Sequence, residues 1–236
     1  MLFEQFKKGI NIGGWLSQYD IIVKKPLTKN NLQQHFDTFI QEKDIRQISL
    51  WQFDHIRLPV SGYLIYDVKE DCLNTSILEY IYKCIEWCSK YHLNIVLDLH
   101  DIYGNIYNAM DNVMPLLIDT VLQERFIRVW ELLTQELLNI KGTVIMFELL
   151  NEVSDASGTY PFSDITGEHY DFSHIELLLW NKLYKQCIDR IRSIDSSRWI
   201  LVGSNGQNSV VYLKELEIMD DPAVFYNFHY YEPQVF

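Results

Sequence analysis

The sequence predicts an α/β protein in which parallel strands alternate with amphipathic helices. Short apolar runs alternate with helical stretches along the whole chain. The runs show no in–out alternation of polar residues, which is typical of parallel strands that are buried on both faces. No Pro/Gly/Ser-rich linker and no break in composition divides the 236 residues. We therefore expect residues 1–236 to form a single domain.

The first half of the chain is expected to supply three strands and two helices. "HIRLPV" is a strand stopped by its proline, and "LNIVLDLH" is apolar nearly throughout. In "SILEYIYKCIEWCSKY" apolar residues recur at spacings of three and four, the helical period. The predicted strands are Gly9–Gly14, His55–Val60 and Leu93–His100, and the predicted helices are Leu32–Leu50 and Ser76–Tyr91.

The second half repeats this pattern around one long insert. The run "TVIMFELL" reads as a buried strand and "RWILVGS" as another. The insert "VSDASGTYPFSDITGEHYDF" reads as a surface loop that is long enough to border a site. The predicted strands are Thr143–Leu150, Arg198–Ser204 and Ala223–Tyr230, and the predicted helices are Leu122–Leu138, Ile175–Ile194 and a short one at Val210–Leu216.

Composition narrows the classes of partner. A net charge of −12 disfavours binding to nucleic acid or to an anionic membrane surface. Cys84 and Cys88 share a face of a helix, but no second Cys/His pair lies at ligand spacing, so core packing is favoured over a metal site. The N-terminus has no secretory signal pattern, and no run reaches transmembrane length. We expect a reduced, cytoplasmic protein, with secretion by another route and the oligomeric state left open.

The position of polar residues favours a closed (β/α)8 barrel over an open doubly wound sheet. An open nucleotide-binding sheet normally has a G-x-G-x-x-G turn after its first strand, and "GINIGGW" lacks it. In a parallel barrel the carboxyl ends of the strands converge on one face. Polar residues gather near those ends here, at Arg57, Asp98, His100, Asn151, Glu152, His229 and Tyr231.

These residue types suit the cleavage of a glycosidic bond. One carboxylic acid protonates the leaving oxygen, and a second carboxylate attacks or activates water. Glu152 is the candidate acid and Asn151 a donor to a sugar hydroxyl. Arg57 and Tyr231 can position a partner carboxylate. The remaining candidates are His100 and His229 as hydroxyl partners and Trp15 as a ring for a sugar face. This chemistry requires no metal and no cofactor.

Five motifs resemble glycoside hydrolase family 5, the cellulase family of clan A, and its compact, signal-less clostridial endoglucanases in particular. They are "GINIGGWLSQY", "FDHIRLP", "IVLDLHD", "FELLNE" and "NFHYYEP", in the family's order. The resemblance implies a (β/α)8 barrel and retaining hydrolysis with Glu152 as acid/base. Arg57, His100, Asn151, His229 and Tyr231 match the family's other site positions. Asp101 departs from the pattern, since many members have a second His there.

The resemblance also implies a nucleophilic Glu on a seventh strand, whereas this sequence ends at Phe236, just past the sixth. We therefore expect a C-terminally truncated chain with six β/α units, no nucleophile and no activity of its own. Glu232 and Asp98 are poorly placed to replace the nucleophile. Glu148 would lie about 13 Å from Glu152 along a strand, against the separation of about 5–5.5 Å that retention needs. Strands one and six would keep open edges.

The expected function is that of an endo-β-1,4-glucanase acting on cello-oligosaccharides or mixed-linkage glucans. Mannanase, exo-β-1,3-glucanase and xyloglucanase activities stay open, because they occur in the same family. A second class is a barrel that binds glucan without cleaving it, although binding alone does not need a proton donor. A metal-dependent hydrolase that uses Asp98, His100 and His229 is the least favoured reading.

Overall fold

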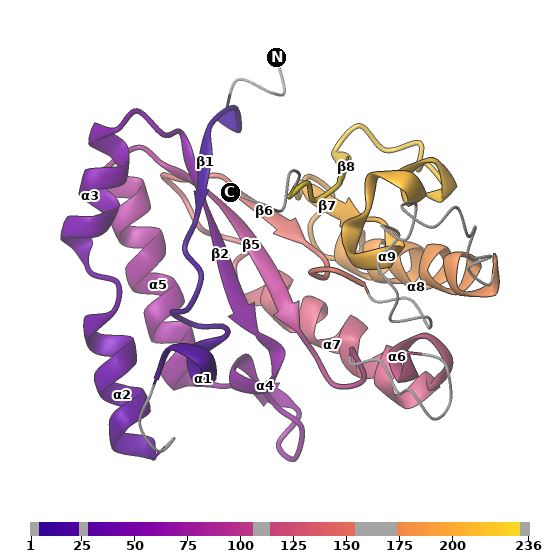
Figure 1. Cartoon of the computed structure of the whole chain (residues 1–236), viewed down its shortest axis with the longest axis horizontal. Coiled ribbons are helices and arrows are strands. Elements are labelled where there is room, and N and C mark those ends of the chain that lie inside the picture. The colour runs from indigo at the N-terminus through magenta and orange to yellow at the C-terminus, as the bar shows by residue number, and fades with distance from the viewer. Residues whose placement is uncertain (1–4, 24–27, 106–113, 154–173, 232–236) are drawn as a thin grey trace. The chain divides into compact units, whose positions relative to one another are not determined.

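The computed structural model describes residues 5–23, 28–105, 114–153 and 174–231, the side chains of 174–177 apart. The main sheet has six strands in the order β1-β2-β5-β6-β7-β8 (Figure 1), and each pairing with a described register is parallel. All six predicted strands are confirmed. Their bounds are β1 Gly9–Asn11, β2 His55–Ser61, β5 Asn94–Asp101, β6 Ile145–Glu148, β7 Ile200–Gly203 and β8 Val224–Asn227.

The predicted helices are confirmed except at one place. The expected helix Leu32–Leu50 is wrong, because the structure has two helices there. The chain breaks at Gln41, whose backbone is extended and whose N–H donates to the Asp44 carboxylate at 2.9 Å, so a new helix begins. The main helices are α2 Lys29–Thr38, α3 Glu42–Leu50, α5 Thr75–Lys90, α7 Thr120–Glu136 and α8 His174–Arg192, and the stretch after β7 forms the 3₁₀-helix η3, Val210–Glu215.

Several short elements have no clear sequence signal. Each is too short for a helical or alternating period to show. They are the helices α1 Tyr19–Ile22, α4 Gly62–Ile65, α6 Pro115–Ile118 and α9 Asn205–Asn208, and the antiparallel pair β3 Tyr66–Asp67 and β4 Cys72–Leu73.

The chain forms two compact units. Unit 1 is Met1–Asp101 with Glu136–Phe147, and unit 2 is Ile102–Gln135 with Glu148–Phe236. The single domain expected from the sequence stays a prediction. The long insert that follows Val153 and the candidate Glu232 lie outside the described residues.

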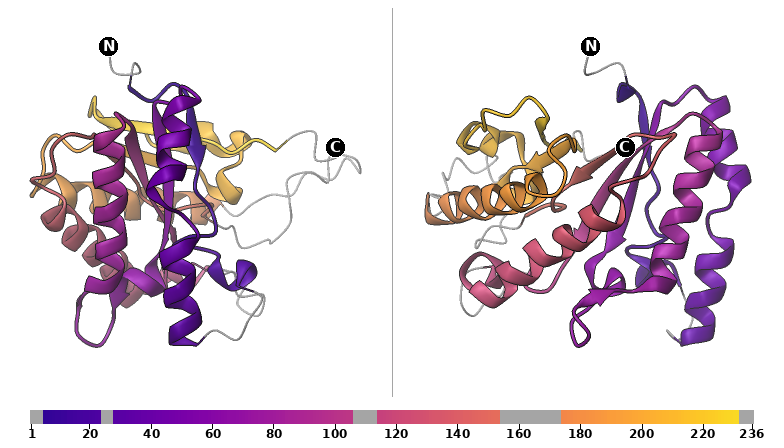
Figure 2. Two further views of the ribbon diagram at one scale, coloured as in Figure 1. Left: turned by 90° about the vertical axis from the view of Figure 1, so that its left-hand side faces the viewer. Right: turned by 180° about the vertical axis from the view of Figure 1, so that it is seen from behind.

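In unit 1 the helices α2, α3 and α5 form a layer beside β1, β2 and β5 (Figures 1 and 2). The apolar stripe of α5 faces this core, and its residues include Ile77, Ile81 and Ile85, all nearly fully buried. Cys84 and Cys88 are buried free thiols in the same stripe. Their predicted role in core packing is confirmed.

In unit 2 two buried tryptophans anchor the backbone at the ends of strands. The indole N–H of Trp130 on α7 donates to the carbonyl of Leu149, just after β6, at 2.9 Å. The indole N–H of Trp180 on α8 donates to the carbonyl of Gly203, the last residue of β7, also at 2.9 Å. Because both rings are fully buried, these bonds fix the points where the chain leaves the sheet. None of the described helices is both long and apolar enough to span a membrane.

Candidate active site

In unit 1 the buried carboxylate of Asp98 holds two of the predicted site residues. Asp98 is fully buried on β5, where a lone charge would be costly. Its Oδ2 lies 2.9 Å from Nη2 of Arg57 on β2 and 2.8 Å from Nδ1 of His100, two residues along its own strand. Arg57 also donates through Nη1 to the Asn11 side chain at 3.0 Å. Asp98 therefore fixes the orientation of both the guanidinium and the imidazole.

This contact also sets the direction of the His100 ring. When Nδ1–H donates to Asp98, the Nε2 atom of a neutral ring is the acceptor. A carboxylate–histidine pair of this kind orients an imidazole toward a hydroxyl donor. Arg57 and His100 are thus brought together as predicted. The sequence pattern marks Asp98 only as a polar residue near a strand end and does not indicate that it positions both of them.

Asp101, the departure from the family pattern, serves a local structural role. Its Oδ1 accepts from the Ser61 hydroxyl at 2.6 Å and from the Gly62 N–H at 3.0 Å. These bonds tie the end of β5 to the turn after β2, where the strand register shifts. Burial raises the pKa of Asp101, and the bond from Ser61 counteracts part of that rise.

In unit 2 the carboxylate of Glu152 is held by His229 and Tyr231. Oε1 of Glu152 lies 2.8 Å from Nδ1 of His229 and accepts from the Tyr231 hydroxyl at 3.3 Å. The two rings meet edge to face at 6.1 Å between centroids. The Glu152 side chain is 31% exposed, so it is accessible from outside the core. These three predicted site residues are brought together in the structure.

The backbone at Glu152 is in the left-handed region, with φ at 42°. A non-glycine residue in that conformation costs roughly 1–3 kcal/mol and is typical of functional sites. Because β6 ends at Glu148, the next four residues do not continue the extended strand. The strained backbone lies at the residue whose side chain points out of the core.

A second carboxylate, Glu148, contacts the same imidazole. It is fully buried, accepts from the Asn227 amide at 3.2 Å and lies 3.9 Å from Nε2 of His229. The strand-based separation of about 13 Å between Glu148 and Glu152 is therefore wrong, because both carboxylates reach one ring across a turn. The burial of Glu148 still excludes it as an attacking group that a sugar could reach.

Between two carboxylates, His229 is a stable cation. Burial by itself would lower the pKa of His229, but the carboxylates of Glu148 and Glu152 outweigh it and raise the pKa to about 9. The ring thus carries a proton at neutral pH. The Asn208 amide also contacts the ring, with its Nδ2 3.3 Å from Nε2.

This pKa makes stability depend on pH. The folded pKa of His229, about 9, lies above the ordinary value of 6.5, so its contribution is full below pH 6.5 and is lost as pH rises through 9. We expect a loss of at most about 3 kcal/mol in the free energy of unfolding over that interval. The test is urea unfolding at several pH values for the wild type and His229→Gln. Equal pH slopes in the two proteins would contradict it.

Asn151 and Trp15 complete the predicted set. The backbone carbonyl of Asn151 accepts from the Asn105 amide at 3.5 Å, and the residue is partly buried. Trp15 does not offer an open ring face to a sugar. It is fully buried, donates its indole N–H to the Phe36 carbonyl at 2.9 Å and lies nearly parallel to Trp87 at 6.2 Å. The predicted sugar-binding role of Trp15 is corrected on this ground.

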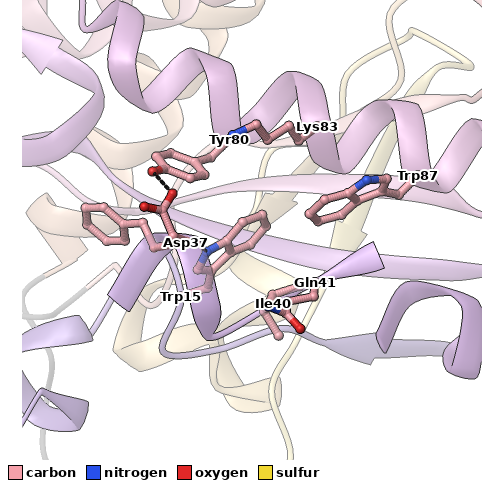
Figure 3. Close-up of a pocket in the computed structure, with 8 residues that line it drawn as sticks. Trp15, Asp37, Ile40, Gln41, Tyr80, Lys83 and Trp87 are labelled. Carbon is pink, nitrogen blue, oxygen red and sulfur yellow. Dashed lines mark hydrogen bonds between the residues drawn. The ribbon is translucent and has the colours of Figure 1, made fainter. Parts of the chain in front are cut away.

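Trp15 instead lines a pocket of about 270 Å³ in unit 1 (Figure 3). Tyr80, Lys83 and Trp87 of α5 form one side of it. Two polar side chains of the pocket pair with each other, since the Tyr80 hydroxyl donates to the Asp37 carboxylate at 2.6 Å. This pattern indicates an aromatic packing cluster.

The described residues hold no group of three His, Cys, Asp or Glu placed to bind a metal ion. The convergence of the Arg57–Asp98–His100 group and the Glu152–His229–Tyr231 group on one barrel mouth stays a prediction.

Comparison with known proteins identifies the family. The family model described as "Cellulase (glycosyl hydrolase family 5)" matches residues 21–236. Endoglucanase C of Acetivibrio thermocellus is 40% identical over 238 residues, which cover 98% of this chain and 59% of the relative. Cellodextrinase A of Ruminococcus flavefaciens is 34% identical over 233 residues, with 97% and 59% covered. The chain thus spans about three-fifths of the length of these relatives.

Solved structures agree on the fold. The cellulose synthase subunit Z of Clostridioides difficile superposes with a TM-score of 0.70 at 25% identity, covering 97% of this chain and 62% of that one. A hyperthermophilic endo-β-1,4-glucanase solved in complex with substrate gives 0.71 at 19% identity, covering 98% and 62%. The expected (β/α)8-type fold, represented here by six strands, is confirmed. With the family model matching most of its length, the chain belongs to the cellulase family, glycosyl hydrolase family 5.

Proposed function

We propose that the protein to which this chain belongs hydrolyses β-glycosidic bonds of glucans with retention, and that Glu152 is its acid/base. The observation that carries the proposal is the carboxylate of Glu152, strained, partly exposed and held through Oε1 by His229 and Tyr231. In a family of sugar-cleaving enzymes, a carboxyl group fixed in this way suits the transfer of a proton to the leaving oxygen.

The contacts of Glu152 and His229 assign a separate role to each group of the site. Because Oε1 accepts both bonds, the plane of the Glu152 carboxyl is fixed, and Oε2 is the atom we assign to proton transfer. Glu148 offsets the positive charge of His229. The ring can therefore hold Glu152 without presenting an uncompensated cation to a group that must carry a proton. Arg57 and His100, oriented by Asp98, would contact the partner carboxylate and a sugar hydroxyl.

The partner carboxylate, which the resemblance places on a seventh strand, stays a prediction. In a retaining enzyme it attacks the anomeric carbon while Glu152 protonates the leaving oxygen, and Glu152 then takes a proton from the water that releases the sugar. No metal or cofactor enters either step of this proposal.

The proposed substrates are β-1,4-linked cello-oligosaccharides and soluble mixed-linkage glucans. Support comes from relatives that are named endoglucanase and cellodextrinase and that share at least a third of their aligned residues with this chain. Glucan 1,3-β-glucosidases also match, but over only 44% of the chain. We therefore rank β-1,4 above β-1,3 linkages.

The test is hydrolysis of cellotetraose by the full-length protein, followed by proton NMR. The β anomer is expected to appear first, because two inversions restore the configuration. The α anomer appearing first would contradict retention. A panel containing mannotetraose and laminaritetraose at equal concentration tests the linkage, and a higher kcat/KM on either would overturn the proposed preference. Binding of cellotetraose without turnover would favour the non-catalytic alternative.

A further inference from the structure

The loop between β7 and η3 contains an unusual run of backbone strain. Gly206, Gln207 and Asn208 are consecutive residues in the left-handed region, with φ near 60° at each. Two of the three are not glycine, and each such residue carries a conformational cost. A strained turn of this kind persists only where surrounding contacts hold it. Here those contacts are with His229 and with the residue that follows Glu152.

The loop braces both partners of that pair. The N–H of Gln207 donates to the carbonyl of Val153, the residue after Glu152, at 3.1 Å. The carbonyl of Asn208 accepts from the N–H of His229 at 2.8 Å. The backbone of the turn is therefore bonded next to the carboxylate on one side and to the histidine itself on the other.

The side chain of Asn208 is buried and clamped against the imidazole. Asn208 is fully buried. A Cβ atom on Gly203 would come within 2.1 Å of its amide, so the amide packs directly on the glycine backbone. Its Nδ2 lies 3.3 Å from Nε2 of His229, and its Oδ1 has no hydrogen-bond partner among the described residues.

In this orientation the Asn208 amide and the protonated His229 ring point hydrogen-bond donors at each other. A protonated imidazole has N–H donors at both nitrogens, and Nδ2 is also a donor. Rotating the amide by 180° exchanges two atoms of nearly equal size. It places the buried, unsatisfied Oδ1 against Nε2. That change supplies an acceptor to the charged ring and a partner to the buried oxygen, and it moves Nδ2 to the position that Oδ1 held.

We propose that Asn208 is a positioning residue whose Oδ1 accepts a hydrogen bond from Nε2–H of His229, so that the ring stays protonated and keeps Nδ1–H directed at Glu152. Glu148 on β6 faces the ring and itself accepts a bond from Asn227 on β8, and Tyr231 meets the edge of the ring. Since Nε2 lies 3.9 Å from Glu148 but 3.3 Å from the Asn208 amide, the amide is the nearer partner. This role deepens the proposed function and rests on it only for its effect on turnover.

The direction of one pKa change tests the proposal. Asn208→Gly retains the left-handed backbone, because glycine adopts positive φ freely, and removes only the amide. We expect the pKa of His229 to fall by about 1 in this variant, since an acceptor for the charged ring is lost. The measurement is a pH titration of the ¹⁵N-histidine-labelled chain, in which His229 is the resonance that His229→Gln lacks. An unchanged pKa would show a structural role only, and a rise would show that the amide donates to a neutral ring.

Two further measurements guard against a variant that fails to fold. Gln207→Gly relieves the neighbouring strain without altering the amide, so the pKa of His229 should stay as in the wild type. In the wild type itself at about pH 8, above the ordinary His pKa, both ring nitrogens of His229 should show the shifts of a protonated imidazole. An unprotonated Nε2 at that pH would overturn the proposal. Neither readout requires turnover, so failure here is distinguishable from failure of the proposed hydrolase activity.

Discussion

Glu152→Gln in the full-length protein is expected to lower kcat on cello-oligosaccharides by about 10²–10⁴-fold. The amide retains the shape of the side chain and can still contact His229 and Tyr231, but it has no proton to give to the leaving oxygen. Initial rates on cellotetraose over a range of concentrations give kcat and KM separately. KM should change little, because the sugar contacts remain.

A matched control separates lost chemistry from lost structure. Glu131 on α7 is a partly exposed carboxylate of the same unit, paired with Arg128 at 3.1 Å. Glu131→Gln should retain kcat within about twofold, because surface ion pairs contribute little. Comparable losses in both variants, or full turnover in Glu152→Gln, would contradict the assignment of Glu152.

Asp98→Asn is expected to destabilise the fold by about 3–5 kcal/mol. Asp98 is fully buried, and the same oxygen holds Arg57 and His100. Removing the negative charge leaves the guanidinium of Arg57, whose side chain is only 19% exposed, beside a neutral amide. The loss appears as a lower urea midpoint with an unchanged slope.

The control for this variant is an exposed ion pair in the same unit. Lys90 and Glu42 lie 2.6 Å apart, with side chains that are 59% and 42% exposed. Glu42→Gln should change the free energy of unfolding far less than Asp98→Asn does, because exposed ion pairs contribute little. If both substitutions lower the free energy of unfolding equally, the burial of Asp98 does not explain its effect on stability.

Much of the fold follows from local pattern. All six strands appear where apolar runs lack alternation, and α5 where residues such as Ile77 and Ile81 recur at the helical period. The break inside Leu32–Leu50 was not predicted, because Gln41 is not a strong helix breaker. It begins a new helix through its contact with Asp44, and a linear pattern does not show that contact.

The residues at the strand ends of the candidate site could be predicted from the sequence, whereas the buried residues that hold them in place could not. Glu152, His229 and Tyr231 are polar residues at the ends of apolar strands, so position alone marks them. Glu148 and Asp98 are carboxylates inside those strands, and burial cost signals that each needs a partner without naming it. Asn208 gave no signal, because its importance depends on a left-handed turn that brings distant segments together.

The central claim is that Glu152 donates the proton to the leaving oxygen. Its most direct test compares the rates of the Glu152→Gln variant on two substrates whose leaving groups differ in their need for a proton. With 2,4-dinitrophenyl β-cellobioside, whose leaving group needs no proton, the burst of dinitrophenol from the full-length variant should match the wild-type rate within about tenfold. With cellotetraose the rate should fall by about 10²–10⁴-fold. Equal losses on both substrates would show that Glu152 is not the proton donor.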